Sequence, residues 1–548
     1  MTGVAAGGTG QPTRRGFLRA AGAVAGAGAL AACTRARALP VRAAARRTGT
    51  PVSGPASPRA AAAAGASPVA ADWQALQRGL STHKLLRPGQ AGYHTARLLF
   101  DPRFDYQRPA GVAYCRTPAD VALCLSFVRK FALPVAARSG GHSYGGWSGT
   151  SGLVVDVTGM NSFQLGPGGG TVTVGTGTHL IDLYHKLAGH GLAVPGGSCP
   201  TVGVAGLTLG GGVGVVGRAY GLSCDNLEAL QIVTADGSVL DIDASRHSDL
   251  FWACRGGGGG NFGVATSLTF RTHQLSSLVL FFLSWPWSQA ERVIRGWQSW
   301  APQAPDALWS NVHLSAAPGG ATPGIQVGGT YLGSISGLTA LLDQLYAGVG
   351  SGPVNPFLQE TPYLQAMLYD AGCYGLTVDQ CHLPWQAPGG QLTRQPSYAK
   401  SDFFTVKLPT AGIQALLAGV EALTGVPGAS SGGGGVAFDA FGGALNRVAA
   451  GATAFVHRDA LFLAQYTTEW GAGATASQVA SQHRWLRKFY ASMRPYASGQ
   501  CYQNYADPDL ANWQQAYYGA NYPRLAHVKG LYDPGQVFRF AQGITPGP

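Results

Sequence analysis

The chain has 548 residues, of which 46% are hydrophobic and 12% are charged, so a chain that is disordered over its whole length is excluded. The length is sufficient for one large two-part domain or for two domains. The formal net charge is +12, but nine arginines precede the first acidic residue, Asp72, and subtracting these nine from +12 leaves +3. The folded part therefore lacks the charge pattern of a nucleic-acid-binding protein.

The N-terminal segment has the pattern of an export signal. Residues 13–19, Thr-Arg-Arg-Gly-Phe-Leu-Arg, match a twin-arginine motif, and the short apolar run 20–32 follows. This run is too short to span a membrane. We therefore expect residues 1–38 to be a twin-arginine signal, which exports folded proteins, and residues 39–71 to be a disordered linker.

Two ways of processing this signal remain open. The sequence Leu-Ala-Ala-Cys that ends at Cys33 is similar to a lipobox, in which case a lipid on Cys33 would attach the protein to a membrane surface. Cleavage after Ala38 would instead release a soluble protein. The expected location is extracellular or anchored at the cell surface, with no membrane contact other than this lipid.

From residue 108 onward, short apolar segments alternate with helical patterns. Thr117, Pro118 and Asp120 supply the cap, the first-turn proline and the acid that are typical of a helix start. Thr178 is expected to cap a second helix with an apolar stripe. Strands are predicted at residues 133–137, 153–157, 171–174, 227–234 and 262–272.

The pattern changes after about residue 276. Strands are predicted at 279–283, 326–331, 403–408 and 460–470, and helices at 289–300 and 338–346. The glycine run 431–435 is expected to be a surface loop. Five tryptophans in this part have a spacing that favours core packing over stacking on a sugar. They are Trp285, Trp287, Trp297, Trp300 and Trp309.

Nine cysteines are present, without any Cys-x-x-Cys spacing, so a zinc site is not expected and no metal ligands are predicted. An exported protein can form disulfides. Cys373 and Cys381 are the closest pair in the second part of the chain.

Two glycine-rich segments contain reactive side chains. The first is residues 138–146 with His142, and the second is residues 196–206 with Cys199. Glycines allow the backbone to approach a cofactor closely, and successive N–H groups can surround a pyrophosphate. Either segment alone is more often an ordinary turn or a buried thiol. Together, an imidazole and a thiol could attach to one ring system.

Further segments occur with these two in a fixed order. Asp-Leu-Phe-Trp-Ala-Cys-Arg at 249–255 precedes five glycines, and the tail contains Tyr-Gln-Asn-Tyr-Ala-Asp-Pro at 502–508. The combination resembles the berberine-bridge-enzyme-like branch of the vanillyl-alcohol-oxidase flavoproteins (PCMH-type FAD-linked oxidases), in an exported bacterial form. The resemblance extends from residue 108 to residue 544.

The resemblance implies an α+β fold. A PCMH-type FAD-binding domain with two α/β subdomains would occupy residues 72–276, with its core at 106–276. A substrate domain with an antiparallel sheet covered by helices would occupy residues 277–498. The C-terminal segment 499–548 would return to the FAD domain.

The resemblance also implies FAD linked covalently through both His142 and Cys199. A small residue such as Val202 leaves the oxygen pocket open in related enzymes, which favours an oxidase. The other residues expected at the cofactor are Arg138, Ser139, Gly140, Gly141, Ser143, Val202, Gly203, Gly206, Gly211, Gly214, Gly263, Val264, Asn504 and Asn521.

Tyr505 matches the position of the catalytic base in many family members, and Tyr144 is the second candidate. A tyrosine has an ordinary pKa near 10, so it needs a cation or hydrogen bonds that stabilise the phenolate. Tyr144, Lys400, Arg447 and Asn504 are candidates for this network. Arg447 stands where the plant alkaloid members have their glutamate base, so their ring closure is not expected here.

The expected function is an FAD-dependent oxidase that passes a hydride from an alcohol or hemiacetal to FAD and electrons to O2, giving H2O2. A sugar, an oligosaccharide or a glycosylated natural product is the expected substrate. Two alternatives remain: a surface lipoprotein with a vestigial flavin site, and a flavin dehydrogenase with another acceptor.

Overall fold

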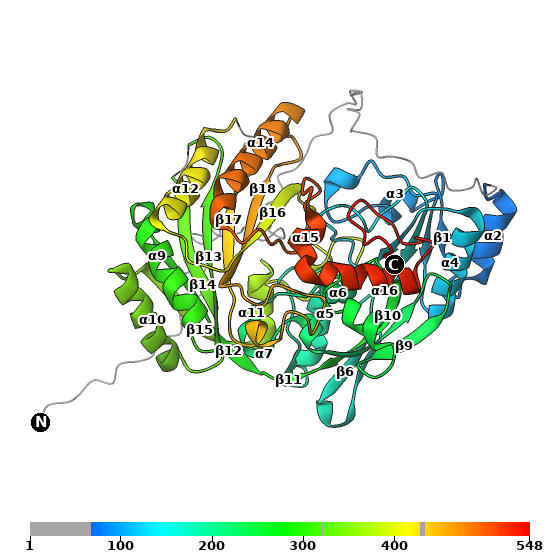
Figure 1. The fold of residues 1–548 in the computed structure, drawn as a ribbon, viewed down its shortest axis with the longest axis horizontal. Helices are drawn as coiled ribbons and strands as arrows, with labels where there is room; N and C mark the ends of the chain where they lie inside the picture. Colours follow the sequence, from blue (N-terminus) through cyan, green and yellow to red (C-terminus); the bar gives the residue numbers. More distant parts are fainter. Residues whose placement is uncertain (1–66, 321, 428–432, 548) are drawn as a thin grey trace, which may run out of the picture.

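The computed structural model describes residues 67–320, 322–427 and 433–547. The predicted export signal, Cys33 and most of the predicted linker lie outside these residues. Helix α2 (Ala70–Gly79) already begins within the last residues of the predicted linker, because the carboxylate of Asp72 accepts a hydrogen bond from the backbone N–H of Val69 (3.0 Å). The described chain forms two lobes that lie side by side (Figure 1).

The first lobe contains a small mixed sheet next to helix α4. The side chain of Thr117 accepts a hydrogen bond from the N–H of Asp120 (3.2 Å), so the predicted helix start is confirmed. Strands β2, β4 and β3 are parallel, and β1 is antiparallel to β2. The elements are β1 (Leu85–Leu86), β2 (Gly111–Tyr114), α4 (Pro118–Phe131), β3 (Val135–Arg138) and β4 (Leu153–Asp156).

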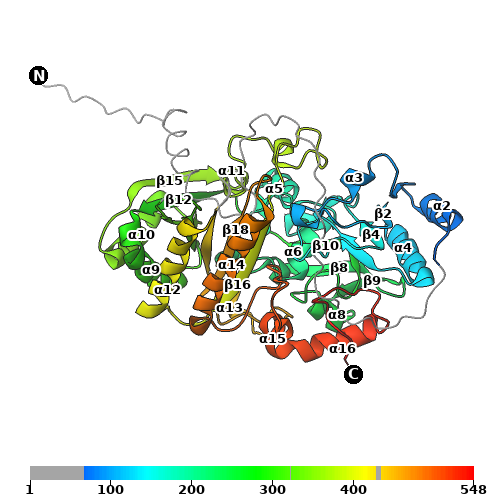
Figure 2. The same ribbon diagram turned by 90° about the horizontal axis from the view of Figure 1, so that it is seen from above.

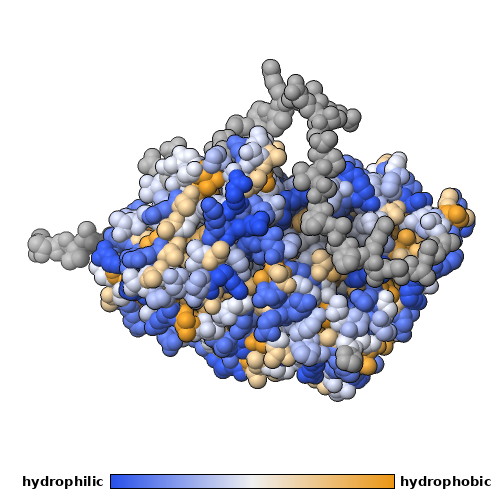
Figure 3. Space-filling view, turned by 45° about the horizontal axis from the view of Figure 1, so that its top comes forward, coloured by the Kyte–Doolittle hydropathy of each residue, from blue (hydrophilic) through white to orange (hydrophobic). Residues whose placement is uncertain are grey.

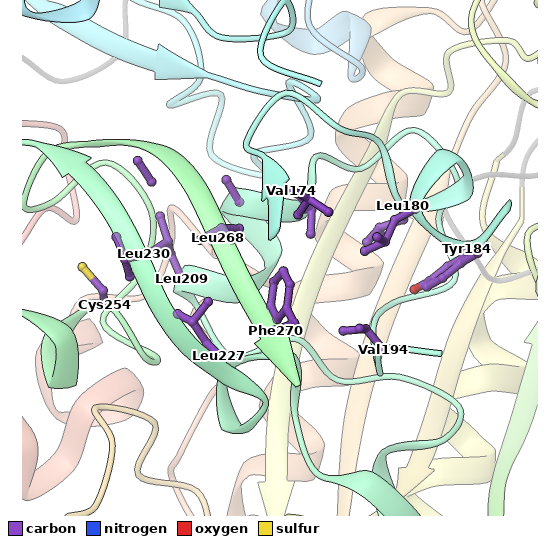
Figure 4. Packing of buried hydrophobic residues seen from close by; sticks show 14 of the residues in the cluster. Val174, Leu180, Tyr184, Val194, Leu209, Leu227, Leu230, Cys254, Leu268 and Phe270 are labelled. Carbon is purple, nitrogen blue, oxygen red and sulfur yellow. The ribbon is translucent and has the colours of Figure 1, made fainter. Parts of the chain in front are cut away.

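A five-stranded antiparallel sheet, ordered β5-β6-β10-β8-β9, completes this lobe. Its buried face shares one hydrophobic core with helices α5 and α6, and Figure 4 shows Leu268 of β10 beside Leu209 and Leu230. Each such side chain contributes about 1.5–3 kcal/mol when it is fully buried. The elements are β5 (Phe163–Leu165), β6 (Thr171–Gly175), α5 (Leu180–Ala188), α6 (Val204–Leu209), β8 (Leu227–Val233), β9 (Val239–Asp243), α8 (Ser248–Ala253) and β10 (Val264–Arg271).

The second lobe is built on a seven-stranded sheet, ordered β15-β12-β14-β13-β17-β18-β16, in which every neighbouring pair is antiparallel. Four helices cover one of its faces (Figures 1 and 2). The strands are β12 (Ser277–Trp285), β13 (Leu308–Ala316), β14 (Gly324–Tyr331), β15 (Val354–Pro362), β16 (Ser397–Phe404), β17 (Gly434–Ala440) and β18 (Phe462–Glu469), and the helices are α9 (Ala290–Trp300), α10 (Ile335–Val349), α12 (Thr410–Glu421) and α14 (Ala476–Met493).

Side chains alternate between the two faces of this sheet, as the period of two in a strand requires. On β13, Val312 and Leu314 belong to the core beneath the helices, whereas Asn311 and His313 line a cavity on the other face. Of the five tryptophans, Trp285, Trp297 and Trp300 are buried in the helix-covered core, Trp287 packs at its edge, and Trp309 lines the cavity.

Two sequence predictions in this lobe were wrong. The strand expected at 403–408 ends at Phe404, since the chain then leaves the sheet and the N–H of Leu408 bonds to the side chain of Gln298 (2.8 Å). The glycine run 431–435 is not all surface loop: Gly434 and Gly435 are the first residues of β17. A Cβ on Gly435 would lie 2.0 Å from the carbonyl oxygen of Leu314, so only glycine fits this pairing.

The C-terminal segment returns to the first lobe as α15 (Trp513–Tyr518) and α16 (Tyr522–Tyr532) (Figure 1). The ammonium of Lys529, which is fully buried, pairs with Asp533 (2.6 Å) and donates to the carbonyl of Asn261 (2.5 Å). The predicted α+β fold with a helix-covered antiparallel sheet is thus confirmed.

Cys373 and Cys381 form a disulfide in the second lobe. Among the described residues, no helix combines the length and apolar character that a membrane span requires. The face in Figure 3 is largely polar, with hydrophobic residues in small separate groups.

Candidate active site

A cavity of about 1540 Å³ lies between the two lobes. It is lined by both glycine-rich loops, by the uncovered face of the seven-stranded sheet and by residues 502–506 of the C-terminal segment. Typical small-molecule sites occupy about 300–1,000 Å³. The cavity is therefore large enough for a dinucleotide together with a substrate.

The two glycine-rich loops touch each other through their backbones. A Cβ on Gly140 would lie 2.3 Å from the backbone nitrogen of Gly203, and a Cβ on Gly203 would lie 2.0 Å from the hydroxyl of Ser139. Any side chain at either glycine would separate the loops. This contact brings His142 and Cys199 to the wall of the same cavity.

The imidazole of His142 is held in a fixed orientation. It stacks on Phe100 with ring centroids 3.9 Å apart, and its Nε2 lies 2.7 Å from the hydroxyl of Thr201. Burial, with a smaller effect from nearby His179, lowers the pKa of His142 to about 3. The ring is therefore neutral at physiological pH and keeps the lone pair that a covalent bond to a cofactor requires.

The predicted site residues meet at this cavity, with two exceptions. Those that line it are Arg138, Ser139, Gly140, Gly141, His142, Ser143, Tyr144, Cys199, Val202, Gly203, Gly206, Gly214, Gly263, Val264, Asn504 and Tyr505.

Gly211 and Asn521 do not line the cavity. Gly211 turns the chain after α6 with φ of 124° and packs against Phe455. The side-chain amide of Asn521 donates to the backbone carbonyls of Ala450 (2.8 Å) and Thr453 (3.2 Å), so it holds a loop of the second lobe instead.

The glycines of the cavity wall leave the space that FAD would need. A Cβ added to Gly206 would meet no atom within 4 Å, and the nearest atom to one on Gly259 would be the Cα of Gly206 at 3.6 Å. Gly258 and Gly260 continue this bare backbone surface. Such a surface suits the close approach of a ring or a pyrophosphate, so the residues present fit an FAD.

Tyr505 and Tyr144 form a stacked pair in the cavity, with ring centroids 5.6 Å apart and planes 7° apart. The hydroxyl of Tyr144 accepts a hydrogen bond from the amide of Gln465 (2.9 Å). Burial raises the pKa of Tyr144 to about 12. Burial, and then the negative charge of Asp439, raise the pKa of Tyr505 well above its usual value.

The cationic partners expected for Tyr505 are engaged elsewhere. The ammonium of Lys400 pairs with Asp507 (2.8 Å), and the exposed guanidinium of Arg447 pairs with Asp306 (2.5 Å). Of the expected network, Tyr144 and Asn504 lie at the cavity. The surroundings therefore disfavour a Tyr505 phenolate.

Two carboxyl groups of the cavity were not predicted from the sequence. Asp439 lies on β17 and Asp370 is the last residue of α11 (Tyr363–Asp370). Burial raises the pKa of each to about 7, and the charge of Asp370 adds to the shift of Asp439. A buried carboxyl with a pKa near the working pH is suited to act as a general base.

The remainder of the sheet face is polar with a few aromatic rings. Burial lowers the pKa of His313 to about 4, so this imidazole is neutral at physiological pH. Amides and hydroxyls around it offer donors and acceptors to a ligand rich in hydroxyl groups. The side chains of this face are Asn311, His313, Gln326, Gln465, Phe282 and Trp309, and Tyr369 of α11 stacks on Phe282.

Two protein-family models match this chain, one in the first lobe and one in the C-terminal segment. One described as "FAD binding domain" matches residues 109–243, and one described as "Berberine and berberine like" matches residues 501–545. An uncharacterized FAD-linked oxidoreductase of Bacillus subtilis (strain 168), YgaK, is 32% identical over 476 residues, covering 86% of this chain and 98% of that protein. The chain belongs to the berberine-bridge-enzyme-like family of FAD-linked oxidases.

Solved structures of berberine-bridge-enzyme-like proteins have the same fold. BBE-like 1 of Physcomitrella patens superposes with a TM-score of 0.78 at 30% identity, over 87% of this chain and 99% of that one. Xylooligosaccharide oxidase from Myceliophthora thermophila C1, in complex with xylobiose, has a TM-score of 0.76 at 26% identity, over 87% and 99% of the two chains.

As a member of this family, the chain is an FAD-dependent oxidoreductase, and the hypothesis of a lipoprotein with a vestigial flavin site is not supported.

Sequence reasoning missed Asp439 because β17 was not predicted. The segment Val-Ala-Phe-Asp-Ala at 436–440 contains the signal: Asp439 is out of phase with the buried Val436, Phe438 and Ala440.

Proposed function

We propose that this FAD-linked oxidoreductase is a carbohydrate oxidase, which converts a hemiacetal or secondary alcohol to the carbonyl compound and O2 to H2O2. The observation that carries the proposal is the position of a polar sheet face opposite the glycine-rich loops across one cavity. Its amides, imidazole and the carboxyl of Asp439 suit sugar hydroxyls, and its rings suit the apolar face of a sugar. The fold shared with a xylooligosaccharide oxidase supports this substrate class.

We propose that the carboxylate of Asp439 accepts the proton of the substrate hydroxyl while the C–H bond breaks. FAD, when bound, supplies the hydride acceptor. A pKa raised to about 7 gives this carboxylate a useful proton affinity near neutral pH. Tyr505 stays protonated and donates a hydrogen bond to the same substrate oxygen, instead of acting as the base itself.

We propose that FAD is linked covalently to His142 and Cys199. The neutral, oriented imidazole and the position of both side chains on one cavity wall support this. Acid-precipitated protein should remain yellow, His142→Ala and Cys199→Ala should each keep one link, and the double variant should release FAD. Release of all flavin from the wild-type protein on denaturation would refute the covalent linkage.

O2 is proposed as the electron acceptor because Val202, a small residue, lines the cavity. A peroxide assay of the purified enzyme against mono- and oligosaccharides and glycosylated metabolites tests the acceptor and the substrate together. If sugars reduce the flavin but peroxide does not appear in air, the protein is a dehydrogenase with a different acceptor.

We propose export by the twin-arginine route, to the extracellular space or the cell surface. The disulfide between Cys373 and Cys381 is consistent with an oxidising compartment. Arg14→Lys with Arg15→Lys should retain active, flavin-loaded enzyme in the cytoplasm, and unchanged secretion would exclude this route. Cys33→Ala should release the enzyme from membranes if the lipid is present.

A further inference from the structure

Three potential metal ligands meet on the side of helix α5 that faces the second lobe. The carboxylate of Asp182 lies 3.2 Å from Nε2 of His382 and 3.6 Å from Nδ1 of His179. The ligand atoms of all three residues lie within 4.8 Å of one another. Tetrahedral zinc with bonds of 2.0–2.2 Å separates its ligand atoms by about 3.4 Å, so the cluster already has nearly the required spacing.

The two imidazoles are buried and oriented by a second set of contacts. His382 is 4% exposed, and its Nδ1 lies 2.9 Å from the carbonyl oxygen of Val378. This contact suits a proton on Nδ1 and leaves Nε2 facing the carboxylate of Asp182, as in the outer ligand shells of metal sites. His179 is 8% exposed, and the amide of Gln386 lies 3.4 Å from its Nε2.

We propose that His179, Asp182 and His382 bind a divalent transition-metal ion of the zinc type. Two imidazoles and one carboxylate form a ligand set that zinc accepts, with one coordination position left for water. The side chain of Asp182 is 33% exposed, which gives the ion and this water access from solvent. Binding displaces any proton held on Nε2 of His382, and no oxidation state changes.

The position of the cluster indicates what the metal would hold together. Backbone N–H groups of Leu180 and Ile181, at the start of α5, donate to the carbonyls of Val202 and Pro200 in the Cys199 loop. His382 directly follows the disulfide-bonded Cys381, in the segment after α11, which Figure 2 shows next to α5. The ion would therefore fasten this segment of the second lobe to the first lobe.

The segment after α11 that contains His382 forms part of the cavity wall. Tyr374, Gln391 and Thr393 line the cavity on either side of His382 in the sequence. At the far end, the guanidinium of Arg394 pairs with Asp105 of the first lobe (2.7 Å). The metal and this ion pair would thus secure the segment at two points, independently of the flavin chemistry.

The test is direct measurement of zinc in the purified full-length holoenzyme. The enzyme is treated with a chelator, incubated with a small excess of Zn2+, freed of unbound ion by gel filtration and analysed by mass spectrometry. We expect one zinc ion per chain and a Tm that rises with zinc concentration. X-ray absorption should show nitrogen and oxygen neighbours without sulfur.

His382→Gln and Asp182→Asn should each abolish both the bound zinc and the rise in Tm. Asp182→Asn guards against loss of fold, since it keeps the size of a partly exposed side chain. His185→Gln is the matched control, because this exposed histidine of the same helix lies outside the cluster. Zinc retained at the wild-type level in both cluster variants, or absent from the wild-type enzyme, would overturn the proposal.

Discussion

The two faces of the seven-stranded sheet are made by the same strands but have opposite compositions. Toward α9, α10, α12 and α14 the sheet presents an apolar surface, in which Phe438 is 1% exposed. Toward the cavity it presents amides, an imidazole and the carboxyl of Asp439. Neighbouring residues of one strand therefore have opposite effects on stability. Burial of the apolar, helix-covered face stabilises the fold, whereas burial of the polar groups on the cavity face opposes folding.

Asp439→Asn tests the cavity face and should have the largest effect. Removing a general base typically slows a reaction about 10²–10⁴-fold, and flavin reduction by substrate in stopped flow should slow by this factor. The fold should be retained, since the amide has the shape of the neutral acid. Asp370→Asn, at the other cavity carboxyl, is the control; if it were the slower variant, Asp370 would be the base.

Phe438→Ala tests the helix-covered face, at the residue next to Asp439. The ring of Phe438 packs against Phe462 with centroids 5.2 Å apart, and its removal should cost about 3–5 kcal/mol in the free energy of unfolding. Denaturant unfolding measures this loss. The rate of flavin reduction per folded molecule should stay near that of the wild type. A strong loss of rate without loss of stability would show that the two faces are not separable.

Tyr505→Phe should have a smaller effect on rate than Asp439→Asn. A neutral hydrogen bond contributes about 0.5–1.5 kcal/mol, so its loss should slow flavin reduction by about 2–10-fold. Oxidation of the reduced enzyme by O2 should be unchanged. A 10²-fold or larger loss would return the role of base to Tyr505, as the sequence alone suggested.

The last expected effect is on the pH dependence of stability. Asp439 has a folded-state pKa of about 7, above its ordinary value of 3.8, so between these values the native state binds more protons than the unfolded state. Its contribution to stability therefore falls as the pH rises from about 4 to 7. The Tm of Asp439→Asn relative to wild type should increase over this range, and a constant difference would contradict the shifted pKa.

Local sequence signals predicted several parts of the molecule that depend on local chemistry, but the cap expected at Thr178 was wrong, because α5 begins after His179 without a side-chain cap. The cap at Thr117 and the two glycine-rich loops are determined by residues within a few positions of one another. Asn521 of the C-terminal segment was also expected at the cofactor, but its side chain bonds to a loop that only the tertiary fold brings near.

Features that depend on distant residues were not predictable in this way. The face of β17 that Asp439 occupies is set by its register with β13 and β18. His382 meets Asp182 across 200 positions of sequence, so no spacing rule could place them together. The shifted pKa of Asp439 arises from burial, which exists only in the folded chain.

The FAD site is completed late in synthesis, because one wall of its cavity comes from residues near the C-terminal end of the chain. His142 leaves the ribosome well before Tyr505, and at 5–20 residues per second the interval is roughly 20–70 s. During that time the glycine-rich loops have no closing wall, because Asn504 and its hydrogen bond to the carbonyl of Leu207 (2.9 Å) do not yet exist. The complete FAD site is therefore a property of the finished chain, and no nascent fragment that ends before the C-terminal segment contains it.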